Sequence, residues 1–332
     1  MRVLMIKLSS FGDIIHTLPA LNALKKAYPE AEIDWITEEI GYSFLYGHPY
    51  LRKILLFPRH TLTKKFKKSQ LLEVIKEIII LRKKLKNNYD LIIDFQGLLK
   101  SGFIAFLAEG KEKIGFANSR EKGVFFFFTK KIKTNYQEHA ILRYLKLLNC
   151  AGIPVSFKDI SFPLPPVPNV SFDIKQPYIV INPVTRWESK MWFLEKWTAL
   201  GKALLNLGYE VVFTGQKRDK EYIKFICQNI GSSINLAGKT DLKSLIPLYE
   251  KAHLVISLDT GTLHLAVATG TPTISLFGPT APWRTGPFGK GHIVFFKKLS
   301  CQPCFKRKCK TRECMKKIEV EEIISAVKEM GG

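Results

Sequence analysis

The first candidate for chemistry is an aspartate at a junction where an apolar strand gives way to an amphipathic helix. The junction reads KLSSFGDIIH and contains Asp13. An acidic residue in the first turn of a helix is favoured by the helix dipole, so a purely structural role is the ordinary interpretation. However, Ser9 and Ser10 already offer capping hydroxyls, and Gly12 allows a ligand to approach the backbone. Asp13 is therefore also a candidate to act on a substrate.

A second junction of the same kind occurs in the C-terminal half, where the segment SLDTGTLH follows an apolar run. Asp259 ends the expected strand, and Thr260 and Gly261 open the expected helix. The first backbone N–H groups of such a helix have no partner within it and form a common phosphate site. The alternative interpretation is that Asp259 only caps the helix and that His264 packs on its face.

A third segment, PVTRWESKMW, follows the apolar run YIVIN and contains Thr185 and Lys190. A hydroxyl and a cation at the end of a strand can neutralise a departing diphosphate, although exposed lysines are more often simply solvated. The chain has neither the GxxxxGK[ST] motif of P-loop ATPases nor the GxGxxG motif of dinucleotide-binding enzymes. Neither of those two classes is therefore indicated.

The elements that position these residues alternate between apolar strands and helices, which predicts parallel βαβ units. Strands are expected at residues 2–8, 33–36, 90–95, 178–182, 210–213, 253–258 and 273–277. Helices are expected at 14–28, 64–86, 193–207, 222–230, from about 263, and at about 320–330.

Five prolines fall within residues 161–177 and disfavour a helix or a central strand there. We therefore expect a Pro-rich linker at 161–177 between a Rossmann-like domain at 1–160 and a second at 178–314, followed by a C-terminal helix at 315–332. The expected fold class is α/β, with two parallel sheets facing a central cleft. Open parallel sheets bind ligands beyond the carboxyl ends of their strands, which is where all three junctions lie.

Charge and composition narrow the class of protein further. The 332-residue chain has 51 Lys and Arg against 29 Asp and Glu, a formal net charge of +22. Such an excess favours nucleic acid, anionic lipid headgroups or phosphorylated substrates as partners. No zinc finger, RNP-like aromatic motif or basic region joined to heptads is present, so nucleic-acid binding has only the electrostatic argument. No apolar run is long enough to span a bilayer and no signal peptide is evident, so we expect a cytoplasmic protein.

Four of the six cysteines lie close together in the segment CQPCFKRKCKTREC. Four thiolates can bind zinc, but this spacing is not that of two separated C-x2-C knuckles. Reduced thiols are the favoured interpretation, because structural disulfides are rare in the cytosol. A structural metal is the alternative for Cys301, Cys304, Cys309 and Cys314.

Four segments taken together resemble the lipopolysaccharide heptosyltransferase family: KLSSFGDIIHTLPAL, DFQGLLKSG, VTRWESKMW and SLDTGTLHLAVATGTPTISLFGPT. They occur in the family's order and spacing over nearly the whole chain. DFQGLLKS and the later NSRE are most similar to heptosyltransferase I, which adds the first heptose of the inner core to Kdo on lipid A.

This resemblance implies a GT-B fold, an inverting reaction, an ADP-heptose donor and a Kdo-lipid A acceptor. It places Asp13 at the general base and Lys190 at the departing diphosphate. It places donor binding at Thr185, Lys190, Asp219, Asp259, Thr260, Gly261 and His264, and acceptor binding at Ser10, Gly12, Gln96, Lys100, Arg120 and His139. Asp219 stands where relatives often carry glutamate. Because a lysine and a helix N-terminus can replace Mg²⁺, we expect no metal and no other cofactor.

The same resemblance implies a peripheral position on the cytoplasmic face of the inner membrane. The basic segment from Lys64 to Lys86 could rest on that anionic surface, or it could be a solvated helix face. Two alternatives stay open for function: heptosyltransferase II, which acts on a heptosylated acceptor, and a basic protein that binds nucleic acid or phosphate without catalysis.

Overall fold

The computed structural model describes residues 1–119, 121–167 and 169–331. The chain divides into two compact units, Met1–Pro166 and Val167–Gly332. Each unit contains a six-stranded sheet whose paired strands run parallel. The predicted α/β class with two Rossmann-like sheets is confirmed.

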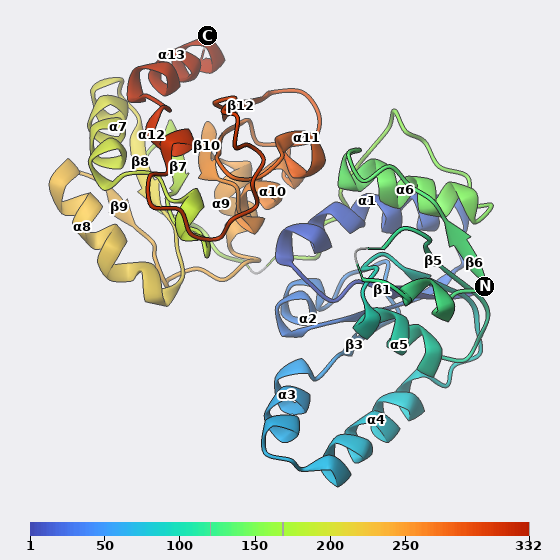
Figure 1. Cartoon of the computed structure of the whole chain (residues 1–332). Coiled ribbons are helices and arrows are strands. Elements are labelled where there is room, and N and C mark those ends of the chain that lie inside the picture. Colours follow the sequence, from blue (N-terminus) through green and yellow to red (C-terminus); the bar gives the residue numbers. More distant parts are fainter. Residues whose placement is uncertain (120, 168, 332) are drawn as a thin grey trace. The chain divides into compact units, whose positions relative to one another are not determined.

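The sheet of the first unit has the order β3-β2-β1-β4-β5-β6. Its strands are β1 (Arg2–Ile6), β2 (Glu32–Thr37), β3 (Lys53–Leu56), β4 (Tyr89–Asp94), β5 (Gly110–Phe116) and β6 (Lys130–Ile132). Its helices are α1 (Phe11–Ala27), α2 (Glu39–Leu45), α3 (Arg59–Lys67), α4 (Leu71–Leu85), α5 (Leu99–Leu107), the 3₁₀ turn η1 (Val124–Phe127) and α6 (Ala140–Cys150). Helices α1 and α6 pack side by side, and α3 packs against α4 (Figure 1).

The sheet of the second unit repeats that order as β9-β8-β7-β10-β11-β12. Its strands are β7 (Tyr178–Asn182), β8 (Glu210–Phe213), β9 (Ile234–Asn235), β10 (Leu254–Leu258), β11 (Thr273–Phe277) and β12 (His292–Phe296). Its helical segments are η2 (Glu188–Lys190), α7 (Leu194–Asn206), η3 (Lys217–Asp219), α8 (Lys220–Ile230), α9 (Leu245–Glu250), α10 (Gly261–Ala268), α11 (Pro282–Thr285), α12 (Glu313–Lys316) and α13 (Val320–Gly331).

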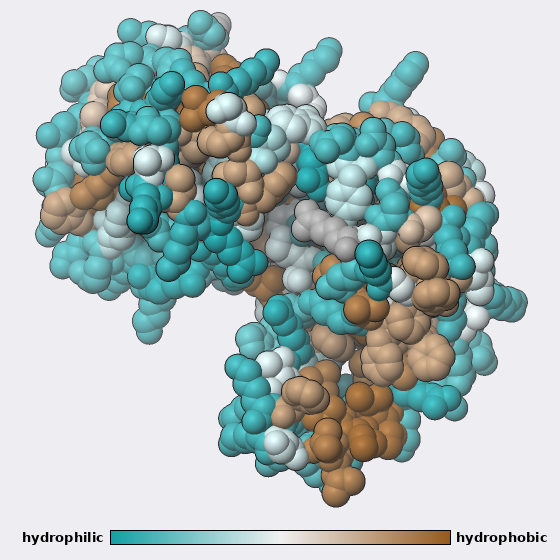
Figure 2. All heavy atoms as spheres, in the orientation of Figure 1, coloured by the Kyte–Doolittle hydropathy of each residue, from teal (hydrophilic) through white to brown (hydrophobic). Residues whose placement is uncertain are grey.

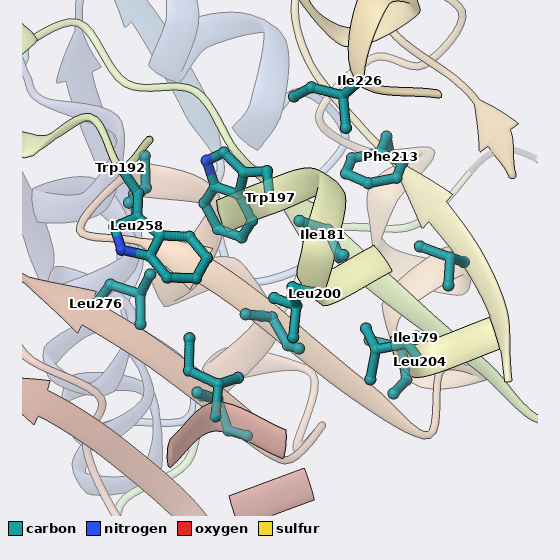
Figure 3. Close-up of a cluster of buried hydrophobic side chains, with 14 of the residues drawn as sticks. Ile179, Ile181, Trp192, Trp197, Leu200, Leu204, Phe213, Ile226, Leu258 and Leu276 are labelled. Atoms are coloured by element: carbon teal, nitrogen blue, oxygen red, sulfur yellow. The ribbon is translucent and has the colours of Figure 1, made fainter. Parts of the chain in front are cut away.

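The core of the second unit forms where α7, α8 and α13 cover one face of its sheet. Trp192 and Trp197 meet edge to face with ring centroids 4.8 Å apart, against apolar residues of β7 and β10 (Figure 3). Ile318, Ile323 and Val327 belong to the same cluster. The C-terminal helix is therefore part of this core, and it is preceded by the short helix α12.

The basic segment predicted as one helix over 64–86 is two helices, and this prediction was wrong. Helix α3 ends at Lys67 and α4 begins at Leu71. Between them Ser69 adopts the left-handed backbone conformation with φ of 55°, which ends one helix and allows the next to start in a new direction.

The Pro-rich stretch is irregular in its described part, and its beginning is attached to the first unit. Asn22 donates a hydrogen bond to the Ser161 hydroxyl at 2.7 Å. A ring nitrogen of His48 hydrogen-bonds to the carbonyl of Pro163 at 2.9 Å. The boundary between the compact units falls after Pro166, within the stretch.

Candidate active site

Both sheets have the strand order 3-2-1-4-5-6, and this order determines where loops can gather around a ligand. The order reverses between the first and fourth strands, so the loops that follow these two strands turn to opposite faces and leave a crevice. We call the place where the order reverses the switch point of the sheet. It lies between β1 and β4 in the first unit and between β7 and β10 in the second. Most of the predicted site residues follow these four strands.

In the first unit, Asp13 lies in the first turn of α1, directly after the β1 loop. Its Oδ2 accepts a hydrogen bond from the Ser10 backbone N–H at 3.0 Å and another from the Ser10 hydroxyl at 2.8 Å. The serine hydroxyls in the sequence suggested that Asp13 could be left to act on a substrate, with a structural role at the helix start as the other interpretation. In the structure the N-cap Ser10 and Asp13 bind each other, and Gly12 beside them is buried.

The loop between β1 and α1, which precedes Asp13, is held in place by a side chain that follows β4. The side-chain carbonyl of Gln96 accepts hydrogen bonds from the backbone N–H groups of Leu8 and Ser9 at 3.0 and 3.1 Å. Gln96 thus connects the two loops at the switch point. The structure gives Gln96 a positioning role toward the β1 loop, which was not expected from the sequence.

Lys7, a buried cation behind this loop, was not among the predicted site residues. Its Nζ donates to the Tyr144 hydroxyl at 2.7 Å and to the Phe95 carbonyl at 3.0 Å. Burial lowers the pKa of Lys7, but Tyr144 and the charges of Asp13 and Asp94 raise it, and the net direction is upward. Lys7 therefore stays protonated and places a fixed positive charge near the Asp13 carboxylate. The only signal for it in the sequence is a lysine that directly follows the continuous apolar run VLMI.

Two further residues, Lys100 and Arg120, were predicted to bind the acceptor. Lys100 Nζ is 2.6 Å from Glu38 Oε1, and Arg59 contacts the other oxygen of Glu38 at 3.1 Å. Glu38, which directly follows β2, was not predicted. Arg120 lies outside the described residues.

Two histidines meet beside Asp13. His139 is the N-cap of α6, and its Nδ1 accepts the Ile141 N–H at 3.3 Å. Its ring packs edge to face against that of His16, with centroids 5.3 Å apart. Since His16 lies three residues after Asp13 on α1, both side chains project from the same face of the helix. His16 was not among the predicted site residues.

Asp94 ends β4 and is completely buried. Its carboxylate accepts hydrogen bonds from the Ser101 hydroxyl at 2.7 Å and from the backbone N–H groups of Gln96 and Gly97. Burial nevertheless raises the pKa of Asp94 to about 6 from an ordinary value of 3.8. The folded protein therefore holds a proton between about pH 4 and pH 6 that the unfolded chain releases.

We expect this proton to make the free energy of unfolding pH-dependent. The contribution of Asp94 is largest below about pH 4 and declines as the pH rises to about 6, by on the order of 3 kcal/mol. Asp94→Asn keeps an oxygen for the two N–H groups and cannot titrate. Urea unfolding of both proteins from pH 4 to pH 7 should show the native protein losing stability relative to the variant as the pH rises. Parallel profiles would contradict the assignment.

In the second unit, the central pair is Lys190 and Asp259, which follow β7 and β10. Lys190 Nζ is 2.6 Å from Asp259 Oδ2, and both side chains are close to nine-tenths buried. The same oxygen accepts the Thr280 hydroxyl hydrogen at 2.6 Å. Lys190 also lies 4.6 Å from the centroid of the Trp187 ring. Thr280, which follows β11, was not predicted.

The start of α10 lies next to this ion pair. Thr260 is its N-cap, and its hydroxyl is 2.8 Å from that of Thr262. Gly261 is the first helical residue, and His264 is buried in the first turn. The first amide groups of α10 therefore begin two residues after the ion-paired Asp259.

Two other donor candidates occupy neighbouring loops. Asp219, after β8, accepts the Gln216 N–H at 2.8 Å and so closes its own turn. The Thr185 backbone N–H contacts the Met191 sulfur at 3.4 Å, which fixes the loop that leads to Lys190.

The six cysteines are free thiols. The Cys309 pKa is lowered, chiefly by the Arg312 backbone N–H at 3.4 Å. Burial raises the Cys314 pKa, and nearby Cys301, Cys304 and Cys309 add to this. Within residues 1–119, 121–167 and 169–331, no three His, Cys, Asp or Glu side chains are placed to hold a metal ion together.

Comparisons with known proteins are consistent with this geometry. The family model of glycosyltransferase family 9 (heptosyltransferase) matches residues 78–315. Lipopolysaccharide heptosyltransferase 1 of Pseudomonas aeruginosa is 30% identical over 93% of this chain and 87% of its own length. The structure of E. coli heptosyltransferase WaaC with ADP superposes with a TM-score of 0.83 at 26% identity, covering 99% of this chain and 100% of that one. WaaC with ADP-2-deoxy-2-fluoro heptose gives 0.81 at the same identity, with 99% of each chain covered.

The fold and the paired switch points thus define a glycosyltransferase of the GT-B type. Asp13 in the first unit and Lys190 in the second are the charged side chains that are candidates for a catalytic role. Within that class the chain belongs to glycosyltransferase family 9, the heptosyltransferases.

Proposed function

We propose that this enzyme transfers heptose from ADP-L-glycero-D-manno-heptose to Kdo of lipid A, with inversion at the anomeric carbon, in lipopolysaccharide inner-core synthesis. The observation that carries the proposal is the placement of Asp13 and Lys190, each beside the switch point of its own sheet. The names of the relatives support the choice of sugar and donor: a lipopolysaccharide heptosyltransferase 1, and WaaC structures with ADP and with a fluorinated ADP-heptose. On this proposal, residues 1–160 bind the acceptor and 178–314 bind the donor.

On the acceptor side, Asp13 is the general base. A Kdo hydroxyl oxygen attacks the anomeric carbon of heptose, and its proton passes to the Asp13 carboxylate as the new C–O bond forms. The Ser10 hydroxyl and N–H hold that carboxylate in one orientation. The cations of this unit, including Lys100, match the negative charges of Kdo and lipid A phosphates.

On the donor side, Lys190 and the start of α10 receive the diphosphate. The bond between the anomeric carbon and the β-phosphate oxygen breaks, and the electron pair leaves with ADP. Negative charge then grows on the phosphate oxygens, where an ammonium group and helix amides stabilise it. The donor must draw Lys190 partly away from Asp259, whose Oδ2 is still hydrogen-bonded to Thr280. These groups fill the charge-balancing role that Mg²⁺ has in many nucleotide-dependent enzymes, so we propose catalysis without a metal.

The decisive experiment measures ADP release by the purified chain with ADP-heptose and two acceptors, one ending in Kdo and one already heptosylated. We expect turnover with the Kdo acceptor, little with the heptosylated one, and no loss in EDTA. Preference for the heptosylated acceptor would assign the second heptose step instead. No turnover with either acceptor, together with salt-sensitive binding to nucleic acid, would favour a non-catalytic binding protein.

A further inference from the structure

An irregular basic segment joins β12 to α12 in the second unit. It comprises residues 297–312, here called the strap, and contains seven Lys or Arg and no Asp or Glu. The strap is the stretch that runs from β12 to α12 in Figure 1, and hydrophilic side chains cover much of this side of the unit in Figure 2. The groups proposed above to bind the donor lie outside it. Its contacts nevertheless lead to Lys190 and to the carboxylate that Lys190 binds.

Ser189, which directly precedes Lys190, is bound twice by the strap. Its backbone N–H donates to the Arg307 carbonyl at 3.2 Å, and its hydroxyl donates to the Lys306 carbonyl at 2.5 Å. Ser189 is only 1% exposed, so water cannot readily replace these partners. The strap therefore fixes the backbone of η2 immediately before Lys190.

Two further contacts of the strap reach residues next to Lys190. Arg312 donates a hydrogen bond from its guanidinium group to the Met191 carbonyl at 3.2 Å. The Arg307 guanidinium lies 5.6 Å from the centroid of the Trp187 ring, which is the ring that the Lys190 ammonium group approaches to 4.6 Å. Because a cation is attracted to an aromatic face, Arg307 helps to fix the ring against which Lys190 lies.

The strap also holds the loop after β11, which carries Thr280. The Phe305 N–H donates to the Pro279 carbonyl at 2.9 Å, and the side-chain amide of Gln302 donates to the Gly278 carbonyl at 2.5 Å. Gly278 and Pro279 immediately precede Thr280 in the chain. The position of the Thr280 hydroxyl therefore depends on the strap as well.

The two sets of contacts converge on one carboxylate oxygen. Lys190 and Thr280 both bind Asp259 Oδ2 at 2.6 Å, although they follow different strands. The residue before each of them is hydrogen-bonded to the strap. One segment thus holds both partners of Asp259 in register. Such support matters for chemistry, because a group misplaced by about 1 Å can lose about 10²-fold in rate.

We propose that the strap is a positioning element of the diphosphate site, and that Ser189 and Gln302 are its two positioning residues. Ser189 acts through Lys190, and Gln302 acts through the loop that carries Thr280. Neither residue has to touch the donor. This inference rests on the proposed function, because it assigns the donor diphosphate to Lys190.

Calorimetry of ADP binding by the full chain tests the Ser189 contact. Ser189→Ala removes the hydroxyl donor and should weaken ADP binding about three- to tenfold, the effect of one lost hydrogen bond. Thr271→Val is the matched control. It removes another buried hydroxyl, which donates to the Tyr249 carbonyl at 2.7 Å before the start of β11, and it should bind ADP like the native protein. Native affinity in Ser189→Ala, or equal weakening by Thr271→Val, would overturn the proposal.

A double-mutant cycle separates positioning from a general loss of stability. The background is the variant Lys190→Met, Asp259→Asn, in which both charges of the ion pair are removed. Adding Ser189→Ala to this background should not change ADP affinity further, because the ammonium group that Ser189 positions is gone. A further three- to tenfold loss there would show that Ser189 acts independently of Lys190 and would overturn its assignment.

Steady-state kinetics test the Gln302 contact. Gln302→Met has a similar length, carries no charge and lacks the N–H group that donates to Gly278. We expect kcat for ADP release to fall about three- to tenfold while KM for the acceptor stays unchanged, because the strap supports the donor side alone. An unchanged kcat, or a rise in acceptor KM that accounts for the whole loss, would contradict the role of Gln302.

ADP binding requires neither acceptor nor transfer, so its outcome is separate from that of the proposed reaction. If the native chain binds ADP and the Ser189 variants behave as expected but no heptose is transferred, the strap assignment stands and the proposed function fails. If the native chain transfers heptose while Ser189→Ala keeps native ADP affinity, the proposed function stands and the strap assignment fails.

Discussion

Asp13→Asn is expected to lower kcat by about 10²- to 10⁴-fold, the usual contribution of a positioned general base. The amide keeps an oxygen that can accept the two hydrogen bonds from Ser10, so the start of α1 is preserved while the proton acceptor is removed. ADP affinity, measured by calorimetry, should change little, because the groups proposed to bind ADP lie in the other unit.

Ser10→Ala provides the matched control for that experiment. It removes one hydrogen bond to Asp13 and leaves the carboxylate in place, so its effect on kcat should be less than about tenfold. If Asp13→Asn and Ser10→Ala reduce activity equally, or if Asp13→Asn abolishes ADP binding, the residue has a structural role and the proposed base must be sought elsewhere.

The second large effect is expected at Lys190. Lys190→Met keeps the length of the side chain and removes its charge, and we expect a loss of about 10²- to 10³-fold in kcat together with weaker ADP binding. The same change leaves Asp259 buried without its counter-charge, which typically costs about 3 to 5 kcal/mol of stability.

A double variant separates these two effects. Lys190→Met with Asp259→Asn removes both charges, and the neutral side chain can still accept the Thr280 hydroxyl hydrogen. Urea unfolding should show stability largely restored, while ADP-release kinetics should stay as slow as in the single variant. If the double variant regains activity, Lys190 serves to neutralise Asp259 and has no direct part in diphosphate departure.

Most of the architecture could be predicted from local sequence. The most apolar strands, such as β1, β4, β7 and β10, were located to within two residues, because a strand buried on both faces reads as a continuous apolar run. Strands β3, β5, β6, β9 and β12 were missed. Strands β6 and β9 are very short, and β5 carries charged residues in the segment GKEKIGF, so neither apolar continuity nor alternation marks these three. Strands β3 (KILL) and β12 (HIVFF) do contain short apolar runs, but both are partly exposed strands at a sheet edge and were overlooked.

The break at Ser69 was missed for a different reason. Glycine and proline are the usual signals of a helix end, and the segment KKSQ contains neither. A serine in the left-handed conformation is held there by the packing of α3 against α4, which only the tertiary structure specifies.

The sequence indicated which residues belong to the candidate site but not which of their side chains contact each other. Polar residues after apolar strands indicated Asp13, Lys190 and Asp259. The ion pair between Lys190 and Asp259 joins residues 69 positions apart, and it exists because the strand order places β7 beside β10. The contact of Lys7 with the Phe95 carbonyl and that of Thr280 with Asp259 likewise depend on which strands are neighbours.

The two halves are equal in length, repeat one strand order and bury separate hydrophobic clusters. Because substitutions in separate cores combine additively, natural variation can remodel one half without compensating changes in the other. On the proposed assignment, a lineage could acquire a new sugar acceptor while inheriting its nucleotide recognition unchanged. A family of related transferases could diversify stepwise in this way, by exchanging or retuning one half at a time.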